Sequence, residues 1–97
     1  MNIRQMMKQA QAMQEKVQAE LAATKVEGTA GGGAVRIEMS GTKEIVACRI
    51  DKDAVDPADL EMLQDLIVAA ARDAGRKVDE EVQQKTSRML GGVVPGF

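Results

Sequence analysis

Apolar and polar positions near the start of the chain repeat with the spacing of an amphipathic helix. Apolar residues recur at intervals of three and four, and the opposite face is rich in glutamine. The pattern predicts a helix from Ile3 to about Ala22, which at about 1.5 Å per residue runs roughly 30 Å. Its narrow, heptad-like stripe is suited to packing against another helix. The stripe consists of Ile3, Met6, Ala10, Met13, Val17 and Leu21.

Residues 24–51 show a different pattern, in which apolar and polar side chains alternate between glycine-containing turns. The clearest alternation runs from Val35 to Met39, and a further strand at residues 45–50 has apolar side chains on both faces. Ser-Gly-Thr-Lys at 40–43 is typical of a tight hairpin, and the glycines at 31–33 permit a positive φ in the preceding turn. These features predict an antiparallel meander of three strands.

The glycine triplet admits a second interpretation, a cradle for a phosphate group. Such a loop normally opens a helix and is followed by Lys-Ser or Lys-Thr, whereas this one precedes a strand and lacks that dipeptide. A hairpin turn, or close backbone contact with a partner chain, explains the glycines better. Because a sheet of this size covers only one face with its own helices, its remaining apolar side chains favour a dimer as the functional unit.

A second helical pattern follows an acidic stretch. Asp56 is predicted as the N-cap residue and Pro57 as the first helical residue, because these positions favour such side chains. The apolar periodicity continues to about Leu90, and residues 66–71 are apolar all round, so we expect this portion to be buried on most sides. Gly75 lies inside the pattern, where a bend, a helix break or a close helix crossing would account for it.

The order of these segments predicts an α+β fold, with a helix, a three-stranded antiparallel meander and a long C-terminal helix. Its 97 residues are enough for one core, so residues 1–97 are expected to form a single domain. The glycine pair at 91–92 is expected to end the second helix, which leaves residues 91–97 as a flexible or docking tail.

Composition removes several kinds of chemistry. The chain has no histidine, so histidine-based catalytic triads and zinc sites are excluded. Its single cysteine, Cys48, falls in a predicted strand and is expected to be a small buried hydrophobe. We therefore expect no catalytic residue, no metal or other cofactor and no small-molecule substrate. The chain shows neither a membrane-length apolar stretch nor a signal peptide, which favours a cytoplasmic protein without a membrane partner.

The net charge of −2 conceals an uneven distribution. Residues 1–13 contain two basic and no acidic side chains, and so do residues 83–97. The stretch between them holds nine basic and all fifteen acidic side chains, a net charge of −6. Both ends of the chain are therefore basic around an acidic middle, and this local positive charge matters more for nucleic-acid binding than the overall sign.

Several segments carry a resemblance to a known family. They are residues 6–15 (MMKQAQAMQE), residues 26–35 (VEGTAGGGAV), residues 61–71 (EMLQDLIVAAA) and the ending with Gly91-Gly92 and Pro95-Gly96. Together they resemble the YbaB/EbfC family of bacterial nucleoid-associated proteins over essentially the whole chain. Ser40-Gly41 stands where an Asn-Gly turn is common in the family, a change that should preserve the hairpin.

The resemblance implies a chain that dimerises through its sheet region, with helices projecting like the arms of tweezers. It also implies binding to double-stranded DNA, a chromosome-organising role at the nucleoid in the cytoplasm, an influence on gene expression in some members, and no catalytic activity. The family supplies no agreed set of DNA-contacting residues. Candidate residues are therefore taken from the placement of charge.

Five cations at the basic ends are the predicted DNA-binding residues. Arg4 and Lys8 lie four positions apart, so they share a helix face. Lys85 and Arg88 lie three positions apart and share another. With Lys16, these side chains are predicted to contact DNA phosphates.

Other interpretations stay open at this stage. The same cations are compatible with an ordinary solvated surface. The main functional alternative is a protein-interaction module, whose acidic middle or twin helical arms bind another protein while DNA binding is incidental. An enzyme is the third, but capping and solvation explain the acidic cluster, and no neighbouring nucleophile or phosphate loop accompanies it. Stacking of single-stranded bases is not expected, because the chain has only one aromatic residue.

Overall fold

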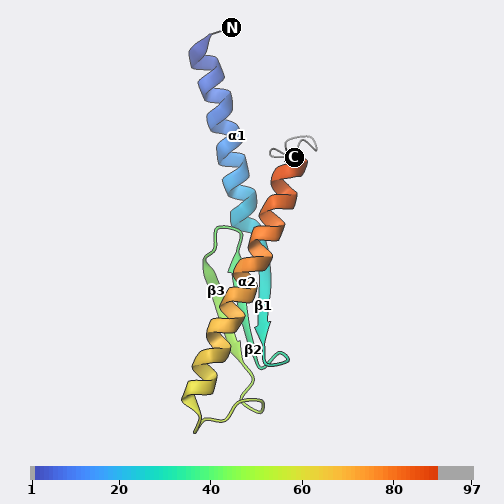
Figure 1. The fold of residues 1–97 in the computed structure, drawn as a ribbon. Coiled ribbons are helices and arrows are strands. Elements are labelled where there is room, and N and C mark those ends of the chain that lie inside the picture. The colour runs from blue at the N-terminus through green and yellow to red at the C-terminus, as the bar shows by residue number, and fades with distance from the viewer. Residues whose placement is uncertain (1, 90–97) are drawn as a thin grey trace.

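The computed structural model describes residues 2–89 as α1 (Ile3–Ala23), β1 (Lys25–Ala30), β2 (Val35–Ser40), β3 (Ile45–Ile50) and α2 (Leu60–Met89) (Figure 1). The strands form one antiparallel sheet in the order β1-β2-β3, which confirms the predicted α+β fold. The molecule measures 66 × 27 × 16 Å, because α1 and the last turns of α2 extend past the same end of the sheet. Among the described residues, neither helix has the hydropathy over a membrane-length stretch that spanning would require.

α1 forms where the sequence predicts it, and it begins with a side-chain cap. The Asn2 side chain accepts a hydrogen bond from the Arg4 backbone N–H at 2.9 Å. None of the 21 residues of α1 is buried, and Ile3, at the start of the apolar stripe, is 74% exposed. Within residues 2–88 the stripe is exposed from Ile3 to Met13, and only Val17 and Leu21, near the sheet, are partly covered.

The core lies between α2 and the sheet face formed by β1 and β2. Alternate residues of β2, Val35, Ile37 and Met39, are buried there, as the alternation predicts. On β1, Gly28 pairs with Ile37, and a Cβ atom at Gly28 would lie 2.2 Å from the backbone oxygen of Ala70. A glycine is therefore required for α2 to approach β1 this closely.

β3 is largely uncovered. Its large apolar side chains are exposed, by 58% at Ile45, 50% at Val46 and 42% at Ile50. Cys48 is exposed as well, so the prediction of a buried cysteine is wrong. The reason is that α2 packs on β1 and β2, and the β3 residues beside them have no helix above them.

A β-bulge interrupts the alternation in β3. Glu38 pairs with Ala47, whereas the next residue of β2, Met39, pairs with Ile45. An unbroken register would pair Val46 with Met39, so Val46 is the extra residue of the bulge. The bulge adds to the apolar surface at the outer edge of the sheet.

Both predicted turns form. Gly31, Gly32 and Gly33 have φ angles of 64°, 68° and 96°, in the left-handed region that glycine adopts without strain. The hairpin between β2 and β3 is closed by a hydrogen bond from the Lys43 N–H to the Ser40 C=O at 2.9 Å. The sequence therefore identified both chain reversals of the meander correctly.

α2 begins one turn later than predicted, after Asp59. The Asp59 carboxylate caps the helix by accepting the Met62 N–H at 3.0 Å. Asp56 closes a separate turn, in which its carboxylate accepts the Ala58 N–H at 2.9 Å and its C=O accepts the Asp59 N–H at 3.0 Å. The prediction of Asp56 as the N-cap and Pro57 as the first helical residue is therefore wrong, because this turn precedes the helix.

α2 is one helix through Gly75, so a break does not occur there. A Cβ atom at Gly75 would meet nothing within 4 Å, which also excludes a close helix crossing among the described residues. Burial over residues 66–71 is less complete than predicted, since Ala70 is fully buried while Val68 is 48% exposed. The predicted tail at residues 91–97 lies outside the described residues.

Candidate nucleic-acid interface

Two cations lie close together near the free end of α1. We call this whole helix the arm. Arg4 and Lys8, the distal group, are exposed and line a shallow pocket of about 190 Å³ with Asn2 and Gln5. Within residues 2–88 neither cation has an ion-pair partner. The positive end of the helix dipole lies here too, and the first turn carries no acidic residue. This combination suits a phosphate group or another anion.

Lys16 is exposed about two turns farther along the arm. At about 100° per residue it is rotated by roughly 80° from Lys8, whereas Glu15 lies on the face of the distal group. Glu15 therefore lowers the positive potential of that face toward the base of the arm. The exposed apolar stripe lies on nearly the opposite side of the helix.

The remaining predicted cations, Lys85 and Arg88, lie in the last turns of α2, where Lys85 contacts the base of the arm. Arg88 is exposed in the last turn of α2. Lys85 is only partly exposed, and its ammonium group donates a hydrogen bond to the Thr24 hydroxyl at the C-terminal end of α1. Thr24 is separated from the distal group by about 25 to 30 Å of helix. The five predicted cations therefore do not form one cluster.

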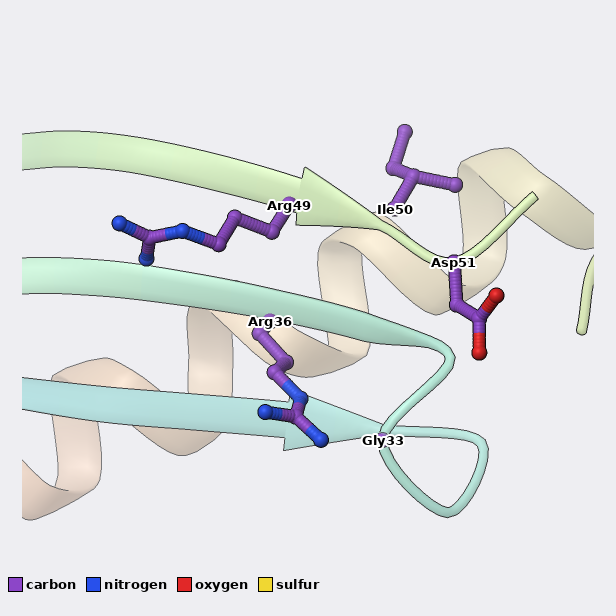
Figure 2. Close-up of a pocket in the computed structure, with 5 residues that line it drawn as sticks. All are labelled: Gly33, Arg36, Arg49, Ile50 and Asp51. Carbon is purple, nitrogen blue, oxygen red and sulfur yellow. The ribbon is translucent and has the colours of Figure 1, made fainter.

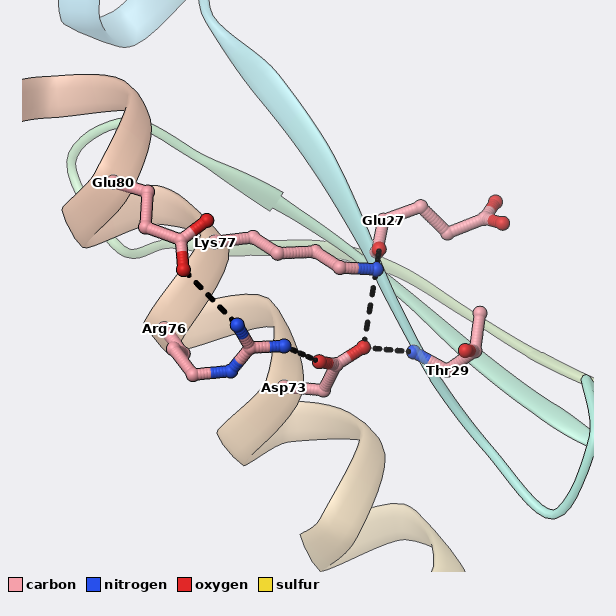
Figure 3. Close-up of polar contacts among 6 residues, drawn as sticks. All are labelled: Glu27, Thr29, Asp73, Arg76, Lys77 and Glu80. Atoms are coloured by element: carbon pink, nitrogen blue, oxygen red, sulfur yellow. Dashed lines mark hydrogen bonds and ion pairs between the residues drawn. The ribbon is translucent and has the colours of Figure 1, made fainter. Parts of the chain in front are cut away.

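Two cations in the middle of α2, Arg76 and Lys77, are engaged by acidic side chains (Figure 3). Asp73 accepts the Thr29 N–H at 2.9 Å and pairs with Arg76 at 2.7 Å and Lys77 at 3.1 Å. The Thr29 N–H, followed by the two cations, lowers the pKa of Asp73 to about 2. Asp73 and Glu80 in turn raise the pKa of Arg76, and Glu80 pairs with it at 3.0 Å. These cations stabilise the fold and are less available to DNA.

Two of the same residues bind backbone groups at one edge of the sheet. β1 is an outer strand, and its Thr29 N–H and Glu27 C=O are held by Asp73 and Lys77 at 2.9 and 2.8 Å. β3, the other outer strand, pairs only with β2 among the described residues. The edge of β3 and its exposed apolar side chains are therefore open to another chain.

A further basic pair lies on the sheet face opposite α2, and the sequence did not single it out. Arg36 pairs across the strands with Arg49, beside a pocket of about 240 Å³ that Gly33 and Asp51 also line (Figure 2). Arg49 is held 3.4 Å from Glu38. Figure 2 shows its guanidinium group directed along the sheet, while that of Arg36 is directed toward Gly33. The two groups do not converge on one anion.

Comparison with known proteins identifies what this chain is similar to. A family model described as the YbaB/EbfC DNA-binding family matches residues 1–93. A nucleoid-associated protein of Chloroflexus aurantiacus is 49% identical over 96 residues, which cover 96% of each chain. Nucleoid-associated proteins of Clostridium novyi and Koribacter versatilis are 48% and 42% identical, covering 100% and 99% of this chain and 89% and 96% of theirs. The crystal structure of an uncharacterized protein from Helicobacter pylori matches with a TM-score of 0.71 and 24% identity, over 93% of this chain and 98% of that one, which shows a shared fold.

Proposed function

The chain belongs to the YbaB/EbfC DNA-binding family, and we propose that it binds double-stranded DNA as a homodimer, mainly through phosphate contacts. The main support is the distal group, because Arg4 and Lys8 share an exposed face with the N-terminal end of a helix. A phosphate oxygen accepts several N–H donors at once, and these two side chains supply them, while the positive end of the helix dipole adds to the attraction. Lys16 extends the contact along the arm, and Arg88 adds a cation at the end of α2. No catalytic activity is proposed.

The homodimer is proposed to form through β3. Its open edge and the exposed side chains of Ile45, Val46 and Ile50 would be covered by the same strand of a second copy. The edge of β1 is occupied by α2 side chains and is unsuited to this role. Two copies present two arms, and weak phosphate contacts on each then act together through their high effective concentration.

Phosphate contacts fit a chromosome-organising role. They position a protein on the duplex without reading the sequence of bases. The protein would therefore bind throughout the chromosome at the nucleoid, in the cytoplasm, and would modulate gene expression as a result of that binding.

A mobility-shift series on two unrelated duplexes of equal length, with salt varied, tests DNA binding. If the two distal groups neutralise about four phosphates per dimer, they alone make log affinity fall with log salt at a slope near −3.6, roughly a hundredfold loss from about 50 to 200 mM salt, and contacts by Lys16 and Arg88 would steepen this slope. Equal affinities for the two duplexes are expected. A slope near zero would remove the electrostatic mechanism, and a strong preference for one duplex would instead indicate base reading.

The oligomeric state tests the role of β3. Ile50→Glu puts a charge into the proposed contact and is expected to shift the protein toward the monomer in analytical ultracentrifugation. Ile3→Glu is the matched control, because Ile3 is also an exposed isoleucine but lies on the arm. The rate at which a thiol reagent labels Cys48 is expected to fall as the protein concentration rises, because dimers then cover β3. A labelling rate that does not depend on protein concentration would contradict this coverage.

A protein-interaction module is the second candidate, favoured by the exposed apolar stripe of the arm. Ile3, Met6 and Met13 are 74%, 52% and 55% exposed, on the side of α1 away from the distal group. A bound protein that persists after nuclease treatment and is lost on Met6→Gln with Met13→Gln would support it. If the purified chain also failed to bind DNA at physiological salt, this candidate would replace the first.

A further inference from the structure

The arm is attached to the rest of the molecule at its last turn. The Thr24 N–H donates to the C=O groups of Glu20 and Leu21, each at 3.1 Å, and the Thr24 hydroxyl donates to the Glu20 C=O at 2.8 Å. The β2–β3 turn holds the same end, because the Gly41 N–H donates to the C=O groups of Leu21 and Thr24, each at 3.0 Å. Thr24 is only 7% exposed, so this junction is buried while no residue of α1 is.

A cation from α2 completes the junction. The Lys85 ammonium group donates a hydrogen bond to the hydroxyl of Thr24, a residue 61 positions earlier. Unpaired carbonyl groups give a helix C-terminus a partial negative charge, which a cation stabilises. The last turn of α1 has no basic residue of its own, and Lys25, which follows it, pairs with Glu38 at 3.6 Å. Lys85 therefore supplies the cation that the end of α1 lacks.

Among the described residues, little apart from this junction fixes the direction of the arm. A pocket of about 350 Å³ opens at its base, lined in part by Gln18 and Leu21 of α1 and by Val78 and Val82 of α2. The two helices diverge from this point toward their outer ends (Figure 1). Because α1 and α2 do not pack together beyond the base, the position of the distal group depends on the junction.

We propose that Lys85 is a positioning residue, which orders the last turn of the arm and thereby sets where the distal group is presented, without contacting DNA. Its effect on affinity rests on the proposed DNA-binding function, whereas its effect on the arm does not need DNA. The proposal gives Lys85 a different role from the phosphate contact predicted from charge alone. The reason is that its ammonium group is partly buried and hydrogen-bonded within the fold.

Hydrogen–deuterium exchange on the DNA-free protein tests the junction. Lys85→Met removes the ammonium group but keeps an apolar stem, and amides over residues 17–24 are expected to exchange several-fold faster. Thr24→Val removes the acceptor at similar volume, together with the hydrogen bond from the Thr24 hydroxyl to the Glu20 C=O, so exchange should be at least as fast as in Lys85→Met. The double variant should exchange no faster than Thr24→Val alone, because the contact of Lys85 is already lost there. Lys85→Arg should restore wild-type exchange. Unchanged exchange in Lys85→Met would overturn the proposal.

The matched control is Lys16→Met, which removes an exposed cation from the same arm and should leave amide exchange unchanged. Salt titration then separates positioning from direct phosphate binding. Lys85→Met should weaken DNA binding several-fold while keeping the wild-type slope of log affinity against log salt, because the same phosphates are neutralised. Lys16→Met should reduce the slope by about 0.9 for each phosphate that is no longer neutralised, or about 1.8 per dimer.

Two outcomes distinguish this proposal from the proposed function. A slope reduced by Lys85→Met as much as by Lys16→Met, with normal amide exchange, would show that Lys85 contacts phosphate directly and would overturn the positioning role. If the wild-type protein does not bind DNA at all, the proposed function fails, and faster exchange in Lys85→Met still supports the role of Lys85 in ordering the arm.

Discussion

The body, formed by the sheet and α2, and the arm, formed by α1, are stabilised in different ways. The body buries Val35, Ile37 and Val78 almost completely, whereas the arm buries none of its residues. Most helical stability in proteins comes from packing an apolar face, which α1 largely lacks within the part of the chain that the structure describes. Close contact therefore constrains the sequence of the body. The arm keeps a cationic face and an apolar face on opposite sides, both available to partners.

The largest effect is expected from Gly28→Ala, which disrupts the close contact between β1 and α2 in the body. The added Cβ atom would lie 2.2 and 2.3 Å from the backbone of Ala70 and Ala74, so α2 has to move away from β1. We expect a loss of about 3 kcal/mol or more in the free energy of unfolding. Urea unfolding followed by circular dichroism measures it. Unchanged stability would show that α2 does not cross β1 at this distance.

The next effect concerns the arm and leaves the body intact. Arg4→Glu with Lys8→Glu is expected to lower DNA affinity on the order of 100-fold at low salt, equally for all sequences. Stability should change by less than about 0.5 kcal/mol, because both side chains are exposed. The control is Arg36→Glu with Lys52→Glu, an equal charge change in exposed residues outside the arm. A similar loss in this control would assign the effect to net charge rather than to the arm.

A smaller effect, tied to pH, is expected in the body at Asp73. Its pKa is about 2 in the fold against an ordinary 3.8, so the carboxylate contributes stability above about pH 4 that is lost as pH falls toward 2. Asp73→Asn should therefore be less stable near neutral pH and lose less between pH 4 and 2 than the wild type. Thermal unfolding over a pH series measures this. Asp65→Asn, an exposed carboxylate on the same helix, is expected to keep the wild-type profile.

The smallest effect is a gain. Gly75→Ala is expected to raise the free energy of unfolding by about 0.5 to 1 kcal/mol, because alanine favours the helix and the new Cβ atom meets nothing within 4 Å. The same urea experiment measures it, so one substitution type gives opposite signs at Gly28 and Gly75. A loss of stability would reveal a contact of Gly75 with a second chain.

Local patterns predicted the elements and turns well. The stripe of α1, the alternation of β2 and the glycines at 31–33 each depend on neighbouring residues, which a sequence displays directly. The predicted start of α2 was wrong because two aspartates lie three residues apart and either could cap a helix. The prediction that Cys48 is buried was wrong because alternation assigns a residue to a sheet face but does not tell how far a helix extends across that face.

Contacts between distant segments could not be predicted. The spacing of Asp73, Arg76 and Lys77 indicates ion pairs along a helix, but the Thr29 N–H that Asp73 accepts is 44 residues away. Charge counting likewise found the distal group of the arm, whose members are neighbours on one helix. It treated Lys85 as equivalent, because the hydrogen bond to Thr24 that distinguishes it arises only in the fold.

The occupied edge of β1 sets a limit on growth. A sheet in which one edge strand is occupied and the other is free can add strands from another chain only at the free edge. If a second copy lies along β3 as proposed, the outermost strands of the pair are both β1, where Asp73 and Lys77 already bind the Thr29 N–H and the Glu27 C=O, so a third copy is not expected to join by strand addition. Association of this kind is then expected to end at a closed pair rather than to continue into filaments.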